Sequence, residues 1–347
     1  MLTLSDFQYE LPPDRIAQLP ADRREEARMM IVERAAADVR HARVADLPDT
    51  LRPGDLLVLN DTRVIPARLF GVKADGGAAV ELLLLRRLDD GTWKAMVRPG
   101  RRLRDGAEIR LPAGARARVT GAFDDGTRAV ALDTPVPLDE YLDAHGATPL
   151  PPYIRRTGSQ NEAFHRLRYQ TVFAREPGSV AAPTAGLHFT PAVLDRLAQL
   201  GVETVSLTLH VGLGTFKPVQ VEDITRHQMD PEGYTLTPDA AARIQAARET
   251  GRRVVAVGTT VTRTLEHLAR GRDGRIAPGS GWTSLFIYPG HEFRVVGALL
   301  TNFHLPGSTL LMLVAAFAGR EFILSCYRQA VDAGYRFYSY GDCMLIA

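Results

Sequence analysis

Histidines and acidic residues that could carry acid–base chemistry stand where apolar segments of the chain end. His188, His210 and His304 each occupy such a position, and Glu232 follows His227 by five residues. An imidazole titrates close to neutral pH, so it can accept or donate a proton during a reaction. We therefore expect at least one of these histidines to act as a general acid or base. The alternative, in which each is only a structural hydrogen-bonding group, stays open on the sequence alone.

A glycine–threonine segment, Gly258-Thr259-Thr260, lies between an apolar run and a helix-like segment. Free backbone N–H groups and the helix dipole at such a place favour a carboxylate or a phosphate. An ordinary helix cap formed by a threonine is the alternative. Gly212 and Gly214 follow another apolar run without completing a G-x-G-x-x-G dinucleotide motif, so we expect a tight turn near a ligand there.

Several common kinds of active site are excluded. The chain has no P-loop, no H-E-x-x-H or H-x-H metal motif, no G-x-S-x-G nucleophile motif and no C-x-x-C pair. Its two cysteines fit a reducing, intracellular compartment. The N-terminus has no signal-peptide pattern, and the apolar run 310–318 is too short to span a bilayer. We expect a soluble, cytoplasmic protein that needs no metal.

The charge of the chain is small in total but uneven along its length. Lysine and arginine number 42 against 40 acidic residues, a formal net charge of +2, which gives no support for a nucleic-acid partner. Segments 86–118 and 151–175, however, are both strongly basic, and the second also contains several aromatic residues. Such surfaces could follow an RNA backbone and stack on exposed bases. A solvated face above core aromatics is the alternative.

Two kinds of structural element must position these residues. From about residue 70 to 132, short alternating apolar segments are separated by turn signals such as Asp90-Gly91 and Asp125-Gly126, which predicts a small antiparallel β-barrel. Proline-rich residues 148–153 form a stiff connector. From residue 178 onward, strands alternate with helices, and the last strand is expected at 335–340.

A chain of 347 residues is long enough for about two domains. The fold class we predict is α/β: a mostly parallel-stranded α/β domain with an inserted small antiparallel β-barrel domain. The discontinuous α/β domain comprises residues 1–69 and 150–347, and the barrel comprises residues 70–149. Ligands in open α/β sheets bind beyond the carboxyl ends of the strands, so residues just after each predicted strand are the candidate site.

Several strings in the sequence closely resemble one known family. They are NDTRVIPARL at 60–69, PLPPYI at 149–154, YQTVF at 169–173, VAAPTAGLHF at 180–189, LHVGLGTF at 209–216, TNFHLP at 301–306 and YRFYSYGD at 335–342. In this order they resemble the S-adenosylmethionine:tRNA ribosyltransferase-isomerase family of queuosine biosynthesis. The resemblance covers essentially the whole chain.

The resemblance implies a fold, a reaction and partners. The implied fold is an α/β domain with an inserted barrel. The implied reaction transfers and isomerises the ribosyl part of S-adenosylmethionine onto the 7-aminomethyl-7-deazaguanine base at the wobble position of tRNA. Adenine and methionine leave, and the product is epoxyqueuosine-tRNA. The implied partners are that tRNA and S-adenosylmethionine as co-substrate, with no further cofactor, no metal and no membrane; we expect a monomer.

Roles can be assigned to candidate residues by the demands of this reaction. We expect His188 or His210 to supply acid–base function and Asp61 or Glu232 to orient a ligand or accept a proton. His227 is a further catalytic candidate. The residues expected to bind S-adenosylmethionine are Thr184, Gly186, Gly212, Gly214, Thr215, Gly258, Thr259, Thr260, Asn302 and His304. The residues expected to bind tRNA are Arg63, Arg68, Arg98, Arg101, Arg102, Tyr153, Arg155 and Arg156.

One position departs from the family pattern. Where the family usually has H-x-M-H-x-E, this chain has His227-Gln-Met-Asp230-Pro-Glu232. An acid in place of the second histidine argues against an imidazole role there, so His227 and Glu232 are the better candidates. Two other functions stay open: an S-adenosylmethionine-dependent RNA methyltransferase, and a tRNA-binding protein without catalysis. Release of free adenine distinguishes the transferase from both.

Overall fold

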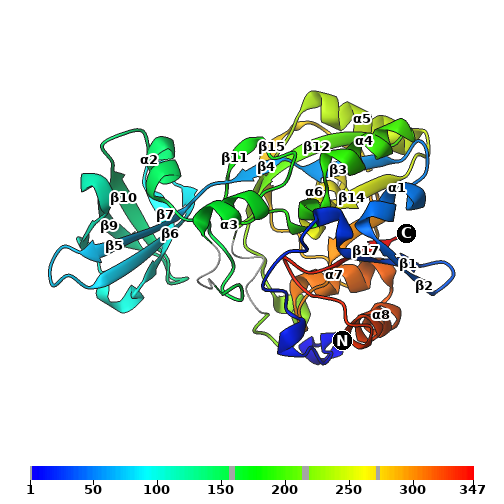
Figure 1. Cartoon of the computed structure of the whole chain (residues 1–347), viewed down its shortest axis with the longest axis horizontal. Coiled ribbons are helices and arrows are strands. Elements are labelled where there is room, and N and C mark those ends of the chain that lie inside the picture. Colours follow the sequence, from blue (N-terminus) through cyan, green and yellow to red (C-terminus); the bar gives the residue numbers. More distant parts are fainter. Residues whose placement is uncertain (1, 156–160, 213–218, 271–273) are drawn as a thin grey trace.

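The computed structural model of the chain describes residues 2–155, 161–212, 219–270 and 274–347. It shows a large α/β domain and a smaller β-barrel that lies at one end of it (Figure 1). The chain leaves the large sheet after β3, builds the barrel, and then returns to complete the sheet. The predicted α/β class with an inserted antiparallel barrel is therefore confirmed. The exact domain boundaries stay a prediction.

A nine-stranded sheet forms the centre of the α/β domain, in the order β15-β13-β12-β3-β14-β16-β17-β1-β2. The four strands β12, β3, β14 and β16 run parallel to one another, and β17 and β1 run parallel to each other. The pairings of β13, β15 and β2, and that of β16 with β17, are antiparallel, so the sheet is mixed and its parallel part is central. The strands are β1 (Arg28–Glu33), β2 (Asp38–Arg43), β3 (Leu56–Asn60), β12 (Glu203–His210), β13 (Glu232–Leu236), β14 (Val254–Val257), β15 (Gly279–Thr283), β16 (Ala298–Asn302) and β17 (Cys343–Ile346).

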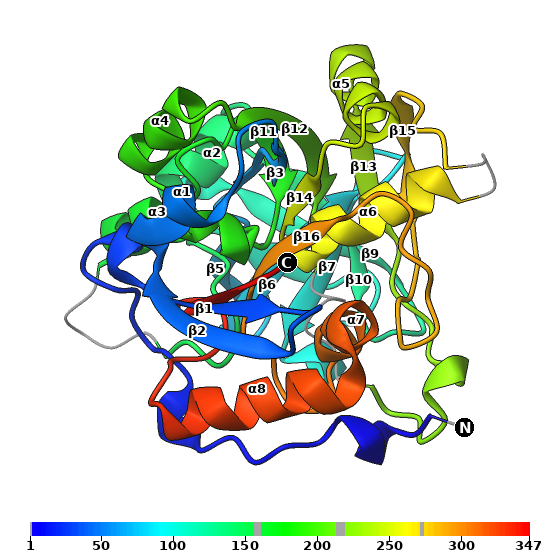
Figure 2. The same cartoon turned by 90° about the vertical axis from the view of Figure 1, so that its right-hand side faces the viewer.

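Helices cover both faces of this sheet (Figure 2). Successive side chains of a strand point to opposite faces, so Leu57 and Leu59 join one hydrophobic core and Val58 joins the other. The first core contains side chains from α1 (Leu47–Thr50) and α4 (Pro191–Gln199). The second contains side chains from α5 (Pro238–Glu249), α6 (Thr259–Ala269), α7 (Thr309–Ala318) and α8 (Arg320–Asp332).

The helix ends follow from local sequence. The hydroxyl of Thr190 accepts the N–H of Val193, and Pro191 occupies the first helical position of α4, as the sequence predicts. In the same way Ser308 caps α7. Within the described residues no single helix has the length and apolar composition to cross a membrane. The adjacent helices α7 and α8 reach that composition only when taken together, and a bend of 116° separates them.

The barrel is closed and has the strand order β10-β7-β6-β5-β8-β9. Small helix α2 (Leu138–His145) packs its buried Tyr141 and Leu142 into the barrel core. The parallel pair β4 (Thr62–Val64) and β11 (Glu176–Ser179) connects the barrel with the α/β domain, next to α3 (Glu162–Arg168) (Figure 1). The barrel strands are β5 (Arg68–Lys73), β6 (Ala79–Arg87), β7 (Trp93–Arg98), β8 (Glu108–Arg110), β9 (Arg116–Ala122) and β10 (Arg128–Asp133).

The predicted terminal strand at 335–340 is wrong. The last strand is β17, and residues 335–340 form an irregular segment in front of it. The reason lies in Asp342, whose carboxylate accepts the backbone N–H groups of Arg336 at 2.8 Å and Arg28 at 2.9 Å. These two bonds bend the chain back, and Tyr338 within the bend has a φ of +75°. An extended strand is incompatible with that conformation.

Candidate functional site

A small polar cavity of about 40 Å³ lies at the carboxyl ends of the parallel strands. It contains most of the residues predicted to bind S-adenosylmethionine, because the loops after β14 and β16 and the segment 182–185 meet there. Val211 and Tyr338 complete its wall, together with Ser339. The predicted residues that line this cavity are Thr184, Gly258, Thr259, Thr260, Asn302 and His304.

The first turn of α6 lies at this cavity. Gly258 is the N-cap, with a φ of +99° that favours glycine, and no side chain caps the helix in the described structure. The alternative of a threonine cap is therefore wrong: Thr259 and Thr260 are already helical, and both side chains are buried at the cavity. A helix start without a side-chain cap offers its N–H groups and the positive end of its dipole to an anion.

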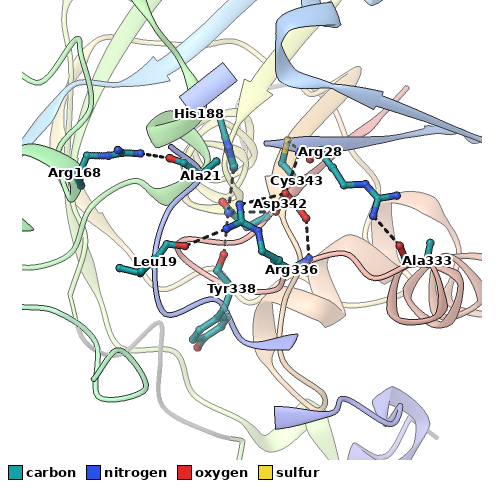
Figure 3. Close-up of polar contacts among 11 residues, drawn as sticks. Leu19, Ala21, Arg28, Arg168, His188, Ala333, Arg336, Tyr338, Asp342 and Cys343 are labelled. Atoms are coloured by element: carbon teal, nitrogen blue, oxygen red, sulfur yellow. Dashed lines mark hydrogen bonds and ion pairs between the residues drawn. The ribbon is translucent and has the colours of Figure 1, made fainter. Parts of the chain in front are cut away.

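Asn302 connects this cavity with His188. Its Nδ2 donates to the carbonyl of Tyr338 at 3.1 Å and lies 3.2 Å from Nε2 of His188 (Figure 3). Because an amide nitrogen only donates, the imidazole accepts through Nε2 and carries its proton on Nδ1. The Oδ1 of Asn302 is buried and has no hydrogen-bond partner among the described residues. The cavity therefore contains one unsatisfied acceptor next to a set of helix N–H donors.

The two buried histidines near this cavity are neutral. Burial lowers the pKa of His188 to about 4, and the nearby charges of Arg336 and Arg24 act in the same direction. Burial alone lowers the pKa of His304 to about 3, and its Nε2 lies 3.0 Å from the hydroxyl of Thr301. Both imidazoles are thus available for hydrogen bonding at neutral pH without carrying a charge.

A second, larger cavity of about 510 Å³ lies between the barrel and the α/β domain. Val211 lines both cavities, so they adjoin at the end of β12. The chain has two tryptophans, and both line the larger cavity: Trp93 from the barrel and the exposed Trp282 from β15. The guanidinium of Arg86 lies 5.7 Å from the ring centroid of Trp282 and connects the two domains across the cavity. Neither tryptophan was among the residues predicted from the sequence, where their rarity was the available signal.

His210, Gly212 and Glu232 also line this larger cavity, together with Asp230. Nδ1 of His210 lies 2.9 Å from the hydroxyl of Thr62. Partial burial lowers the pKa of His210 and outweighs the opposite influence of Asp61 and Glu176, so the imidazole is neutral and able to accept a proton.

Glu232 is held differently from the other residues of this cavity. Its buried carboxylate forms an ion pair with the buried guanidinium of Arg263 in α6. This pair ties the first residue of β13 to the helix whose N-terminus reaches the small cavity. The sequence analysis assigned no role to Arg263.

Besides His188, three residues predicted for catalysis or S-adenosylmethionine binding lie outside both cavities. Asp61 is buried, accepts the hydroxyl of Thr208 and the guanidinium of Arg175, each at 2.7 Å, and has a raised pKa because burial outweighs both contacts. His227 packs its ring against Phe286 at 5.3 Å. Gly186 lies against the side chains of Thr171 and Phe173. Gly214 and Thr215 fall outside the described residues.

The predicted tRNA-binding residues are distributed over both domains. Arg98, Arg101 and Arg102 are exposed on the barrel, and Arg63 and Arg155 are exposed on the connecting segments. Two others make internal contacts. Arg68 is half-buried and pairs with Glu81 at 2.5 Å, and the ring of Tyr153 packs against Tyr338 with 4.1 Å between centroids. Arg156 lies outside the described residues.

Within the part of the chain that the structure describes, no three histidine, cysteine or acidic side chains come together as metal ligands. The expectation of chemistry without a metal or further cofactor stays a prediction.

A polar cavity at the strand ends of an α/β sheet, adjoining a larger cavity under a basic barrel, defines a two-domain α/β enzyme architecture with places for a small ligand and a larger substrate. The chain belongs to the family described as "Queuosine biosynthesis protein", which it matches over residues 4–346. The resemblance seen in the sequence is thereby confirmed.

Named relatives and one solved structure agree with this assignment. The S-adenosylmethionine:tRNA ribosyltransferase-isomerase of Moorella thermoacetica is 53% identical over 347 residues, covering 99% of this chain and 100% of the relative. The protein of the same name from Geobacter metallireducens is 52% identical, with the same coverage. The crystal structure of S-adenosylmethionine tRNA ribosyltransferase from Thermotoga maritima is 38% identical over 99% of this chain and 100% of that chain, with a TM-score of 0.56.

Proposed function

We propose that this chain is an S-adenosylmethionine:tRNA ribosyltransferase-isomerase. It moves the ribosyl group of S-adenosylmethionine onto the aminomethyl group of a 7-deazaguanine base at the tRNA wobble position, and adenine and methionine are released. Whole-length relatives of that name at 52–53% identity support this function. The structural observation that carries it is the pair of adjoining cavities, which share Val211. One receives a small polar group and the other receives a base.

The methionine end of S-adenosylmethionine fits the small cavity. At about 40 Å³, this cavity holds a group of a few atoms but not a nucleoside. The uncapped N-terminus of α6 binds the carboxylate. The unsatisfied Oδ1 of Asn302 accepts an N–H of the α-ammonium group. The ribosyl and adenine parts extend past Val211 and Gly212 towards the larger cavity.

The 7-deazaguanine base fits the larger cavity. Trp93 and Trp282 supply aromatic faces on which a base can stack. The aminomethyl group of the substrate is a primary amine, and the exposed carboxylate of Asp230 on the same wall attracts it as a cation. The amine is the nucleophile once it has lost its proton.

His210 is the general base in this proposal. The sulfonium of S-adenosylmethionine acidifies the C5′ position, so a neutral base near the sulfur must remove a proton there. His210 lines the larger cavity one residue before the shared Val211, and its lowered pKa keeps it neutral. His188 does not line either of these cavities and acts instead as a positioning residue through Asn302. We retain His227, Asp61 and the described arginines as supporting residues without a direct contact to the reacting atoms.

Product analysis tests this proposal. The protein is incubated with S-adenosylmethionine and with tRNA carrying the aminomethyl base, and the small molecules are identified by mass spectrometry. Free adenine and methionine are the expected products. S-adenosylhomocysteine instead indicates a methyltransferase, and binding without turnover indicates a tRNA-binding protein; either result overturns the proposal.

A variant of the base gives the second test. Replacing His210 with alanine lowers kcat by about 100-fold or more, the usual size of a general-base contribution, and leaves the KM for S-adenosylmethionine nearly unchanged. The exposed His145 on α2, changed to alanine, serves as the matched control. A cytoplasmic, monomeric enzyme is part of the same proposal.

A further inference from the structure

A third cavity, of about 20 Å³, lies beside His188 and is distinct from the two cavities described above. Arg24 and Arg168 supply its charged lining, and His188 and Tyr340 are its other titratable residues. Ser339 belongs to its wall as well as to that of the small polar cavity. Among the described residues that line it, none is acidic. The cavity therefore combines a concentration of positive charge with a direct connection to the site of chemistry.

Backbone carbonyls hold both guanidinium groups in fixed positions. Arg24 donates to the carbonyls of Leu187 and Leu167, each at 2.9 Å. Arg168 donates to the carbonyls of Asp22 at 3.1 Å and Ala21 at 2.5 Å (Figure 3). A guanidinium has five N–H donors, so each group retains donors beyond these two bonds. One of them, Nε of Arg168, is buried without a partner among the described residues.

The positive charge at this cavity is not neutralised by the protein. In the described part of the chain, neither Arg24 nor Arg168 forms an ion pair with a carboxylate. Burial lowers the pKa of Arg24, and the charge of Arg168 lowers it further. A third guanidinium, that of Arg336, lies close by; it donates to the carbonyl of Leu19 and is 3.7 Å from Asp342 (Figure 3). Like charges that are held together in this way are stabilised by a bound anion.

We propose that this cavity binds one phosphate group of an RNA backbone. The two forked guanidiniums match the geometry of phosphate oxygens, and a cavity of about 20 Å³ is too small for a base. Arg168 stands on α3, in the basic segment that also carries the exposed Arg155. The side chain of Gln18, two residues before the cavity-lining Pro20, accepts the backbone N–H of Arg155 at 3.0 Å, which holds that segment near the cavity. A backbone that follows the basic segment therefore passes this cavity.

The choice of RNA over a free phosphate rests on the proposed function, in which tRNA is the substrate. Binding tRNA backbone at this place fixes the RNA next to the wall shared with the small polar cavity, through Ser339. Arg24 and Arg336 lie outside the residues and segments predicted from the sequence to bind RNA, and Arg168 lies in the basic segment 151–175 but was not predicted individually. The site is thus an additional contact, separate from the arginines of the barrel.

Equilibrium binding of tRNA without S-adenosylmethionine tests this site, and it requires no turnover. Variants R24Q, R168Q and the double variant are compared with R23Q, which changes a neighbouring arginine whose side chain is 70% exposed and already paired with Glu25. At about 150 mM KCl the double variant binds tRNA about tenfold more weakly, and the slope of log Kd against log[KCl] falls by about one. R23Q behaves as the wild type. An unchanged Kd and slope in the double variant overturns the proposal.

Two further measurements remove ambiguity. The thermal midpoint is recorded for every variant, and R24K/R168K replaces the double glutamine variant if that variant is unfolded. The lysine variant keeps the charge but loses the fork, so an intermediate Kd with the wild-type salt slope is expected, and a wild-type Kd overturns the role of the fork. Inorganic phosphate is also added to the wild type at constant ionic strength. If it stabilises the protein while the variants leave tRNA binding unchanged, the site binds a free phosphate, and the proposal is overturned. Adenine release is assayed separately, so failure of the proposed function and failure of this site give different results.

Discussion

The imidazole of His210 lies directly against the backbone of Gly178. A Cβ atom placed on Gly178 would be 2.8 Å from Cε1 of His210, closer than Cβ atoms approach other atoms in proteins, and 3.1 Å from its Nδ1. Gly178 also has a φ of +143°, which residues with a side chain rarely adopt. The ring is therefore held between Gly178 on β11 and the hydroxyl of Thr62, which is 2.9 Å from Nδ1. This contact fixes the orientation of the proposed base.

Replacing Gly178 with alanine is expected to displace the His210 ring and to lower kcat by about tenfold or more, because general-base catalysis depends on the position of the base. The KM for S-adenosylmethionine should change little, since Gly178 does not line the small polar cavity. Gly279 is the matched control: its φ is +146°, and a Cβ there meets nothing within 4 Å of the described structure. G279A shares the backbone strain, so an equal loss of kcat in both variants would contradict the steric explanation.

The buried ion pair between Arg263 and Glu232 gives a prediction about stability. Changing Arg263 to methionine leaves the carboxylate of Glu232 buried beside an apolar side chain, and we expect the free energy of unfolding to fall by about 3–5 kcal/mol. The double variant R263M/E232Q removes the charge as well and should recover a large part of this loss. Urea denaturation measures both effects. The exposed pair of Arg40 and Glu33 is the control, and R40M should change the stability little. If R263M loses as little unfolding free energy as the control, other groups balance the charge of the Glu232 carboxylate.

Much of the fold could be predicted because its signals are local. Thr190 and Pro191 define the start of α4 within four residues, and the D-G turns separate the barrel strands as expected. The wrong prediction of a strand at 335–340 has a long-range cause. The chain bends there because the carboxylate of Asp342 binds the N–H of Arg28, a residue 314 positions away in the sequence. Contacts of that range leave no periodic signal.

The candidate site, too, could be predicted from the sequence only where its signals are local. The rule that ligands bind at strand ends brought Thr184, Gly258 and Asn302 together correctly, because it depends only on the order of strands and loops. The same rule selected Asp61, which follows β3, but its carboxylate is already bonded to the side chains of Thr208 and Arg175. The larger cavity depends on how the barrel sits against the sheet, and no local pattern in the sequence determines that arrangement.

The neutral histidines predict how stability depends on pH. The pKa values of His188 and His304 fall from the usual 6.5 to about 4 and about 3 in the folded state. As the pH falls below 6.5, the unfolded chain binds protons at both residues and the folded protein does not, so the free energy of unfolding decreases until the folded pKa values are reached. Each histidine contributes about 1.4 kcal/mol per pH unit in this range.

The variant H304Q isolates one of these contributions. Between about pH 6 and pH 5 the slope of the unfolding free energy against pH should fall by about 1 kcal/mol per unit relative to the wild type. H145Q changes an exposed histidine and is the control, for which the wild-type slope is expected. Urea denaturation at both pH values measures the slope. An identical slope in H304Q and the wild type would mean that His304 is protonated in the folded state.

The N-terminus of α6 gives the last prediction, on the KM for S-adenosylmethionine. The side chains of Thr259 and Thr260 are buried at the small cavity, next to the helix N–H groups that we assign to the methionine carboxylate. Valine has the shape of threonine without its hydroxyl, so T259V and T260V remove hydrogen-bonding capacity while the helix stays intact. We expect the KM to rise about threefold to tenfold in at least one of them, the effect of losing one hydrogen bond. T262V is the matched control on the same helix, because the hydroxyl of Thr262 donates to the carbonyl of Gly258 at 3.2 Å and does not line the cavity. If T259V and T260V both keep the KM of T262V, neither threonine hydroxyl contributes to binding S-adenosylmethionine, and the helix N–H groups are the only donors of this turn to the carboxylate.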